Sequence, residues 1–299
     1  MEKWTNKGLL IRPSKKIWWM YSHVGACCAE KINKNLIRLY ISGRGKDNKS
    51  RIGTAIIKWS DEPTVMKISK NPIIDIPNLK AGYFHTDGAL YPEITKFKGK
   101  TFLYFCGWLN YKTFKYNCNI GLALKKSGNF KLYSKAPIFK LDDIDPIGTG
   151  SMSVFKKKNY LLMYYVSFDE WVKKGGKFQH KYYIKIAKSF DGINWIKKNQ
   201  IAVKIKNSEI AVSKPSVISE GKKISMYFSA RGKYYKIFKV SSKDGLKFGK
   251  RSAEIIKKSG SWDSKSREYP CVIRLNKKTI MFFNGNNFGK TGLGYAIKD

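Results

Sequence analysis

Short apolar segments rich in aromatic residues recur five times along the chain. Their central positions are about 55 to 64 residues apart, and a second short apolar segment follows each of them. Runs of this kind, bounded by Gly, Asn and Asp, are typical of β-strands, and no run of ten or more residues keeps a helical period. The pattern predicts an all-β chain. The five segments are LIRLYIS (36–42), TFLYFCG (101–107), LLMYYVS (161–167), ISMYFSA (224–230) and TIMFFNG (279–285).

The regular spacing predicts a fold built from repeated units. Self-similarity at a fixed period indicates stacked supersecondary units, and five units of roughly 60 residues account for 299 residues. We therefore expect a single domain, a five-bladed β-propeller, in which the innermost strand of each four-stranded blade borders a central channel. A β-sandwich with coincidental repetition is the alternative. The expected blades span approximately residues 15–60, 84–130, 145–196, 208–250 and 262–299.

Composition supports one closed domain and restricts its location. Hydrophobic residues make up 42% of the chain, no Pro- or Ser-rich linker interrupts it, and the N-terminus lacks an apolar signal core. No stretch is long enough to span a membrane. Five cysteines form neither an even disulfide framework nor a Cys-x-x-Cys pair. These features predict a cytoplasmic protein without a transmembrane segment.

The formal charge of +38 raises the question of an anionic partner. Only eight of the 59 basic residues are Arg, the residue that forms bidentate contacts with phosphates and bases, and the Lys residues are spread over every turn. We therefore expect no nucleic-acid partner, although a polyanion-binding protein is a third possibility beside the two functions considered below. A positive rim would instead attract an anionic glycan or a sugar nucleotide.

Ionisable residues recur just before each predicted innermost strand. Only 21 carboxylates are present, so their recurrence at one phase of the repeat is informative, because a ring of blades would aim them at a common axis. Two carboxylates facing one cavity are what glycosyl transfer requires. Any single acid could equally be a turn or strand-end residue. The candidates are His23 in the first unit, His85 and Asp87 in the second, Asp143 and Asp145 in the third, Glu209 and Lys214 in the fourth, and Asp263, Arg267 and Glu268 in the fifth.

Other chemistry has weaker support. The three histidines lack the spacing of a zinc site, and neither a GxSxG elbow nor a phosphate-binding GxxxxGK[ST] loop is present, so we expect no metal and no cofactor. Arg44 and Arg231 recur in SGRG and SARG after the aromatic strand, either as repeat-structural residues or as cations lining a cavity. Trp108 could stack on a sugar, although Trp more often packs in a core.

Several of these segments together resemble a known superfamily. SGRGKDNKSRIG, TDGALYPEI, AKSFDGINW, SKPSVI, SSKDGLKF and FFNGNNFGKTGLGYA look like the five-bladed β-propeller glycosidases, which include glycoside hydrolase families 32, 43, 62, 68 and 130. The chain resembles more closely the propeller proteins often found among bacterial surface-polysaccharide genes. The likeness spans nearly the whole chain, and it is more specific for the fold than for a reaction.

The resemblance implies a trio of acids in the central cavity. Asp87 matches the base or orienting position best and Glu209 matches the general acid, with Glu268 and Asp145 as reserves. The first-blade carboxylate is missing, because His23 stands where an Asp is expected, and this departs from classical inverting hydrolysis. Phosphorolysis or transfer from an activated sugar is compatible with the departure. The residues expected to contact substrate or phosphate are His23, Arg44, His85, Trp108, Lys214, Arg231 and Arg267.

We therefore expect a carbohydrate-active enzyme, similar to glycoside hydrolases, that cleaves or transfers a glycosyl unit in an axial acidic cavity. Its predicted role is in surface-polysaccharide metabolism, and its ligand is a carbohydrate, a sugar nucleotide or a sugar phosphate. A glycosyltransferase or phosphorylase that uses a sugar phosphate is one alternative. The other is a propeller that binds glycans without catalysis.

Overall fold

The computed structural model describes residues 4–74, 83–110, 116–174, 176–206 and 208–298. Within these ranges the main regular structure is β-strand, and the only helices are short 3-10 turns. The prediction of an all-β chain is confirmed. No helix in the described ranges has the length and apolar character needed to cross a bilayer. The 3-10 turns are Trp18–Met20, Ser261–Asp263 and Asn287–Gly289.

The strands form antiparallel meanders that follow the order of the sequence. One eight-stranded sheet contains the first two meanders, which a single parallel bridge between Ser50 and Gly88 joins. The first meander contains β2 (His23–Lys31), β3 (Leu36–Arg44), β4 (Ser50–Lys58) and β5 (Thr64–Ile68). The second contains β6 (Gly88–Phe97), β7 (Lys100–Leu109), β8 (Asn117–Lys126) and β9 (Asn129–Leu132).

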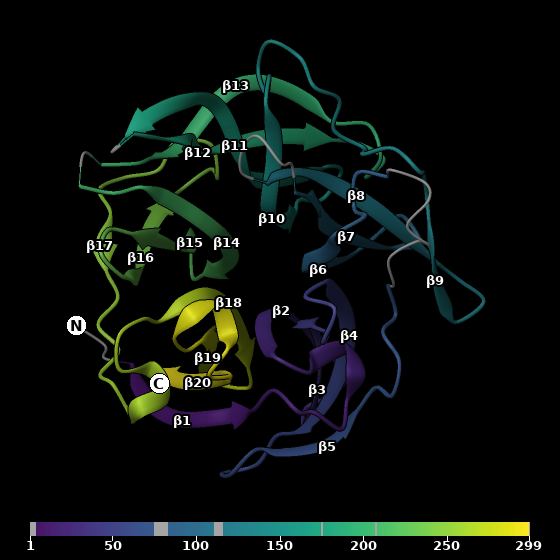
Figure 1. Ribbon diagram of the computed structural model, residues 1–299, viewed down its shortest axis with the longest axis vertical. Helices are drawn as coiled ribbons and strands as arrows, with labels where there is room; N and C mark the ends of the chain where they lie inside the picture. Colours follow the sequence, from purple (N-terminus) through teal and green to yellow (C-terminus); the bar gives the residue numbers. More distant parts are fainter. Residues whose placement is uncertain (1–3, 75–82, 111–115, 175, 207, 299) are drawn as a thin grey trace.

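Two further four-stranded sheets repeat this arrangement. The third meander contains β10 (Gly148–Lys156), β11 (Leu161–Lys174), β12 (Lys177–Ser189) and β13 (Ile196–Lys204). The fourth contains β14 (Ala211–Glu220), β15 (Lys223–Arg231), β16 (Tyr235–Ser242) and β17 (Ser252–Ala253). In each meander the first strand lies nearest the centre of the molecule (Figure 1).

The last sheet combines the two ends of the chain. Strands β18 (Glu268–Leu275), β19 (Lys278–Asn284) and β20 (Leu293–Lys298) are completed by β1 (Thr5–Ile11). In this pairing Thr5 lies opposite Ile297 and Ile11 opposite Leu293. Figure 1 shows β1 beside β20. The N-terminal strand therefore belongs to the last unit, a pairing that the spacing of the repeats does not reveal.

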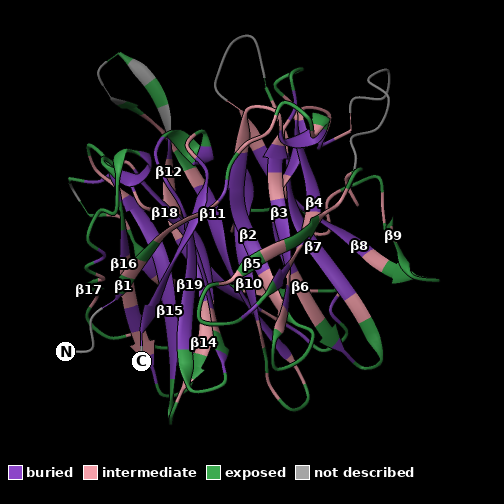
Figure 2. Ribbon diagram, turned by 90° about the horizontal axis from the view of Figure 1, so that it is seen from below, coloured by how far each residue is buried: buried purple, intermediate pink, exposed green. Residues whose placement is uncertain are grey.

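The aromatic segments of the sequence are the second strand of each meander. Their central residues Leu39, Leu103, Met163, Met226 and Met281 are all fully buried. Figure 2 shows buried positions running along most of the length of the central strands. Burial of these side chains between neighbouring sheets removes apolar surface from water and supplies the main driving force for folding.

Two outer turns connect neighbouring units through the same contact. The Tyr104 hydroxyl donates a hydrogen bond of 2.7 Å to the carbonyl of Gly192, and the Tyr164 hydroxyl donates one of 2.8 Å to the carbonyl of Gly245. Both glycines have a positive φ, as an Asp-Gly turn requires. The side chain of Asp191 accepts hydrogen bonds from the backbone of its own turn. The structure thus gives the Asp-Gly pairs the turn role that their sequence indicates.

Candidate functional site

Each of the five innermost strands carries a β-bulge at the same point. In β2, for example, the register shifts between Gly25 and Cys28, and the equivalent shift in β18 lies between Glu268 and Cys271. Bulges are frequent beside active sites because they redirect side chains. The other three shifts lie at 90–93, 149–152 and 213–216.

The bulges place residues in a backbone conformation that L-amino acids rarely adopt. Ala26, Tyr91, Lys214 and Tyr269 all have φ between 43° and 57°. Polar groups of neighbouring meanders hold all four of them, since their backbone N–H groups donate to side-chain oxygens. These bonds join Ala26 to Asn284 at 2.7 Å, Tyr91 to Ser42 at 3.0 Å, Lys214 to Ser151 at 2.8 Å and Tyr269 to Ser229 at 2.7 Å. Strained residues held by their surroundings are typical of functional sites.

A cavity of about 490 Å³ lies at this end of the innermost strands, and residues from all five meanders line it. This volume is within the range of small-molecule sites. Aromatic rings are a prominent part of its wall. They belong to His23, Tyr91, Trp108, Tyr116, Phe168, His180, Tyr182, Tyr235, Tyr269 and Phe288.

Tyrosines form two contacting groups in the cavity wall. The ring of Tyr269 packs edge-on against Tyr91 and Tyr235, with centroids 5.2 Å and 5.4 Å apart. Elsewhere the hydroxyls of Tyr116 and Tyr182 are 3.1 Å apart. Burial raises the pKa of Tyr91 and of Tyr269 well above its usual value. These phenols therefore stay neutral and can serve as hydrogen-bond donors to a ligand.

Two arginines give the cavity a positive character. The guanidinium carbon of Arg44 lies 5.8 Å from the ring centroid of Trp108, and that of Arg231 lies 5.7 Å from the Tyr235 ring. The Nε of Arg44 is buried and makes no hydrogen bond to any residue that the structure describes. None of the described residues that line the cavity is Asp or Glu. The lining thus favours an anionic ligand.

His23 also lines the cavity, and its surroundings keep it neutral. Its Nδ1 lies 2.9 Å from the hydroxyl of Ser22. Burial lowers the pKa of His23 to about 4, and the positive charges of Arg44 and Lys290 lower it further in the same direction. At neutral pH the imidazole is therefore uncharged and can donate or accept a hydrogen bond.

Glu268 is the predicted acid that lies next to the cavity. It begins β18, is 2% exposed and precedes the lining residue Tyr269. Burial raises the pKa of Glu268 to about 8, against the opposing effects of the Phe288 N–H, Ser266 and Arg231. Its Oε2 has no hydrogen-bond partner in the described part of the chain. Glu268 is thus a carboxyl group that keeps its proton at neutral pH, as a general acid must.

The other predicted acids lie outside the cavity lining, and each interacts with other groups of the protein. The carboxylate of Asp87 accepts a hydrogen bond of 2.7 Å from the backbone N–H of Asn110. Glu209 forms an ion pair with Arg251. Asp145 is fully buried, 2.9 Å from the Nζ of Lys197 and 3.0 Å from the hydroxyl of Tyr165. The structure therefore does not gather Asp87, Glu209 and Asp145 into one acidic cavity.

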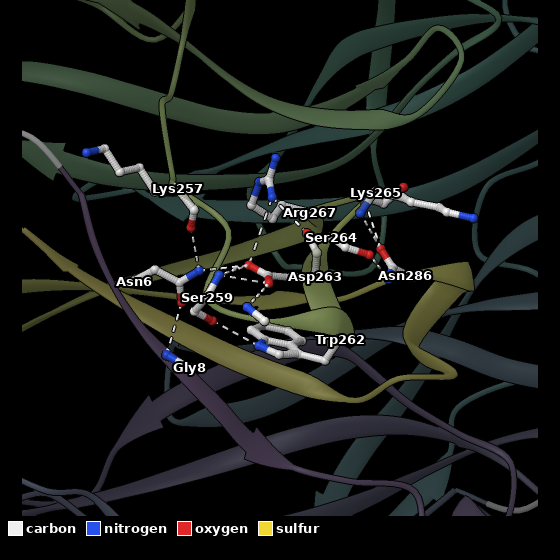
Figure 3. Close-up of polar contacts among 12 residues, drawn as sticks. Asn6, Gly8, Lys257, Ser259, Trp262, Asp263, Ser264, Lys265, Arg267 and Asn286 are labelled. Carbon is white, nitrogen blue, oxygen red and sulfur yellow. Dashed lines mark hydrogen bonds and ion pairs between the residues drawn. The ribbon is translucent and has the colours of Figure 1, made fainter.

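Two more residues predicted to bind substrate lie away from the cavity lining. His85 is fully buried beside Phe84, with ring centroids 4.7 Å apart, and burial lowers its pKa to about 4. Arg267 donates a hydrogen bond of 2.8 Å to the carbonyl of Asp263. Figure 3 shows that Asp263 anchors the N-terminal strand to this region, since its carboxylate also accepts a hydrogen bond of 2.8 Å from Asn6.

Lys214 occupies the bulge position of the fourth unit, but it is 1% exposed and does not line the cavity. Its positive charge acts on Glu93 of the second unit, whose pKa burial nevertheless raises. The carboxylate of Glu93 accepts hydrogen bonds from the Val154 N–H at 2.8 Å and from the Ser153 hydroxyl at 3.1 Å. This buried cluster joins inner strands of neighbouring sheets. Glu93 was not among the residues that the sequence singled out.

The structure thus brings together His23, Arg44, Trp108 and Arg231, with Glu268 behind the wall. Sequence reasoning missed the tyrosines. For Tyr91 and Tyr269 a signal exists, because both precede Pro at the same phase of the repeat. For Tyr116 and Tyr182 we find no such signal. In the described ranges no three His, Cys, Asp or Glu side chains are grouped so that they could hold a metal ion.

Solved structures with the same fold are glycoside hydrolases and related proteins. A glycosyl hydrolase from Bacteroides ovatus matches with a TM-score of 0.75 at 14% identity, over 99% of this chain and 93% of its own. A protein from the GH130 family of mannoside phosphorylases and hydrolases matches with a TM-score of 0.73 at 15% identity, over the same shares of the two chains. An α-L-arabinofuranosidase from Podospora anserina, in complex with cellotriose, matches with a TM-score of 0.65 at 12% identity, over 100% and 97%. The resemblance to the propeller glycosidases is confirmed, and at these identities it establishes the fold.

No protein-family model matches the chain. Two curated proteins of Mycobacterium tuberculosis match over nearly the whole length. "Uncharacterized protein Rv1502" of strain H37Rv and "Uncharacterized protein MT1551" of strain CDC 1551 are each 30% identical over 298 residues, which is 98% of this chain and 98% of theirs. The chain therefore belongs to the same family as these two mycobacterial proteins.

Proposed function

We propose that the five meanders are the blades of a five-bladed β-propeller. The innermost strands support this arrangement, because β2 packs against β6, β6 against β10, β10 against β14, β14 against β18 and β18 against β2. Pairing of β1 with β20 would close the ring by joining the two chain ends in one blade. The axial site would then be formed by segments distant in the sequence.

We infer that the protein is a carbohydrate-active enzyme that moves a glycosyl unit between a phosphate oxygen and an acceptor hydroxyl. One observation carries the proposal. The cavity is lined by Arg44 and Arg231 but by no described carboxylate, and the acid beside it, Glu268, keeps its proton. Arginine is suited to bind the oxygens of a phosphate, and a protonated carboxyl can supply the leaving oxygen with a proton.

This composition fits phosphate chemistry better than hydrolysis. Inverting hydrolysis needs a second, ionised carboxylate to activate water, and retaining hydrolysis needs one as nucleophile. Phosphate brings its own attacking oxygen, and its charge requires cations instead. The missing first-blade carboxylate, with neutral His23 in its place, agrees with this requirement.

In the phosphorolytic direction, we assign the proton to Glu268. The bond between the anomeric carbon and the glycosidic oxygen breaks, the oxygen takes the proton of Glu268, and a phosphate oxygen forms the new bond to the anomeric carbon. In the reverse direction the ionised form of Glu268 takes the proton of the acceptor hydroxyl, the acceptor oxygen bonds to the anomeric carbon, and the bond from that carbon to the phosphate oxygen breaks. Arg44 and Arg231 hold the phosphate, while His23, Trp108 and the tyrosines orient the sugar.

Glycan binding without catalysis is the second candidate. It is favoured by the burial of Glu268, which lies behind the wall rather than in the lining. Cytoplasmic location and a role in surface-polysaccharide metabolism stay predictions from the sequence.

The test is to incubate the purified protein with sugar 1-phosphates and acceptor oligosaccharides and to follow phosphate release by ³¹P NMR. We expect release with the wild type and its loss in Glu268→Gln, with sugar 1-phosphate binding retained. Glu62→Gln, a change of the same type at an exposed position, is the control. Saturable sugar binding without a product would support the binding role instead. Hydrolysis of a glycoside without phosphate would overturn the proposed reaction.

A further inference from the structure

The β11–β12 hairpin is longer than the other hairpins in the described part of the chain. Its strands have 14 and 13 residues, whereas the other described strands have at most 10. Figure 2 shows the end of this hairpin rising above the body of the sheets, over the label of β12. Phe168, midway along β11, lines the cavity, and the strand continues beyond it to Lys174. The hairpin therefore extends the wall of the cavity outward.

One face of this hairpin is aromatic from the cavity to the tip. Phe168 pairs with Tyr182, and Trp171 pairs with His180. Since paired residues and every second residue share a face of an antiparallel pair, Phe178 lies on the same face as His180 and Tyr182. We call these five residues, Phe168, Trp171, Phe178, His180 and Tyr182, the aromatic strip.

The strip begins inside the cavity and ends in solvent. Phe168, His180 and Tyr182 line the cavity, Trp171 is half-buried, and Phe178 is 56% exposed. The His180 ring lies between Phe168 and Trp171, with centroid distances of 4.4 Å and 4.0 Å. Ring contacts thus join Phe168, His180 and Trp171, and Phe178 follows on the same face toward the tip of the hairpin.

Polar contacts fix the base of the hairpin. The Nζ of Lys185 donates hydrogen bonds of 2.5 Å to the carboxylate of Asp169 and to the carbonyl of Ile144. Glu170 and Lys181 form an ion pair farther along the hairpin. A wall that is ordered before the ligand arrives loses less conformational entropy on binding.

We propose that the aromatic strip is a saccharide subsite that binds the part of a glycan extending out of the cavity. The inference rests on the proposed function and names its acceptor class, an oligosaccharide rather than a free monosaccharide. The four residue steps of strand from Tyr182 to Phe178 span about 13 Å, a length that accommodates more than one sugar ring. The partly exposed rings of Trp171 and Tyr182 and the exposed ring of Phe178 suit this ligand because a sugar presents apolar C–H faces and polar edges.

The test is isothermal titration calorimetry with manno-, cello- and xylo-oligosaccharides, from the monosaccharide to the hexasaccharide. We expect the affinity of the wild type for at least one series to rise with chain length. Trp171→Ala and Phe178→Ala should remove this rise, with about fivefold to tenfold weaker binding of the hexasaccharide and unchanged binding of the shortest ligand. Phe190→Ala, at an exposed phenylalanine beyond the opposite end of β12, is the matched control.

The following results would overturn the inference that the aromatic strip is a saccharide subsite. Equal affinity for short and long saccharides, or an equal loss in Phe190→Ala, shows that the strip is not a subsite. Self-association that Trp171→Ala abolishes, without a length effect, makes the strip a contact between two copies of the chain. If phosphate is still released but the subsite test fails, the proposed function stands and only the subsite is wrong. If neither phosphate release nor saccharide binding is observed, both the proposed function and the subsite are wrong.

Discussion

Arg251 holds the carboxylate of Glu209 in a two-point ion pair, and both side chains are more than nine-tenths buried. The guanidinium of Arg251 also lies 4.3 Å from the centroid of the Phe238 ring, and Glu209 accepts a further hydrogen bond of 2.9 Å from the Lys206 N–H. The acid that matches the superfamily pattern best is thus part of a buried structural pair.

Replacement of Glu209 should therefore affect stability rather than turnover. Glu209→Gln leaves the Arg251 charge buried without its partner, and breaking such a pair costs about 3 to 5 kcal/mol. We expect a clearly lower Tm by calorimetry and unchanged activity per folded molecule. Unchanged Tm with lost activity would contradict this reading and return Glu209 to the catalytic role that the sequence predicts.

Glu268 should respond to pH in the opposite way to a surface carboxylate. Its pKa is raised to about 8 in the folded state, whereas the unfolded carboxyl titrates near its usual 4.5. Between these values the unfolded state releases a proton that the folded state retains, so this group lowers stability progressively as pH rises. Above about pH 8 the folded carboxyl also ionises, and the rate of phosphorolysis, which needs its proton, should fall.

Glu268→Gln separates the two effects. The amide carries no ionisation cost, so the variant should be more stable than the wild type in urea denaturation near pH 8 and closer to it near pH 5. Glycosyl transfer should be lost at both pH values. A variant that is less stable at both would show that the carboxyl is held for structure.

Arg44 should control the titration of His23. Burial lowers the pKa of His23 most, and Arg44 is the first of the two cations that lower it further. In Arg44→Met the pKa of His23 should rise from about 4, as followed by NMR of the imidazole. His85 is an internal control, since burial alone lowers its pKa to about 4. An unchanged His23 pKa would show that the charge of Arg44 does not act on His23. It would also be evidence against the proposed anion site.

The sequence predicts the strands because each one carries its own signal. Leu103 and Met226 lie in short aromatic runs whose pattern requires burial whatever their neighbours are, and both are fully buried. No local signal in the sequence shows which partner the carboxylate of Asp145 binds. One such partner is Lys197, which β13 brings to within 2.9 Å of the carboxylate from more than fifty residues away. A carboxylate before an inner strand can therefore face the axis or pair within the protein, and only the tertiary structure decides.

The sequence does not predict the tyrosines of the cavity wall, for a related reason. The hydroxyls of Tyr116 and Tyr182 are 3.1 Å apart, although Tyr116 directly precedes β8 of the second meander and Tyr182 lies in β12 of the third. Tyrosine is common in strands of any kind, so its presence in a predicted strand does not indicate a cavity. The bulges that turn Tyr91 and Tyr269 toward the centre arise from register shifts that a hydrophobic pattern does not record.

The N-terminal strand should decide whether the last sheet is stable. β1 pairs along β20 from Thr5 to Ile11, and Trp4 donates a hydrogen bond of 2.6 Å to the carboxylate of Glu254. Deletion of residues 1–12 would leave the edge of β20 unpaired, and an unpaired strand edge favours aggregation. We expect a large loss of Tm and concentration-dependent association in light scattering.

A synthetic peptide of residues 4–12 added in trans should restore Tm in a saturable manner, because it binds the native state alone. A peptide in which Leu9 and Ile11 are replaced by Asp is the control and should have no effect, because Ile11 is 4% exposed and Leu9 packs against the core of this sheet. Full stability of the deleted chain would show that the last sheet does not depend on the N-terminal strand.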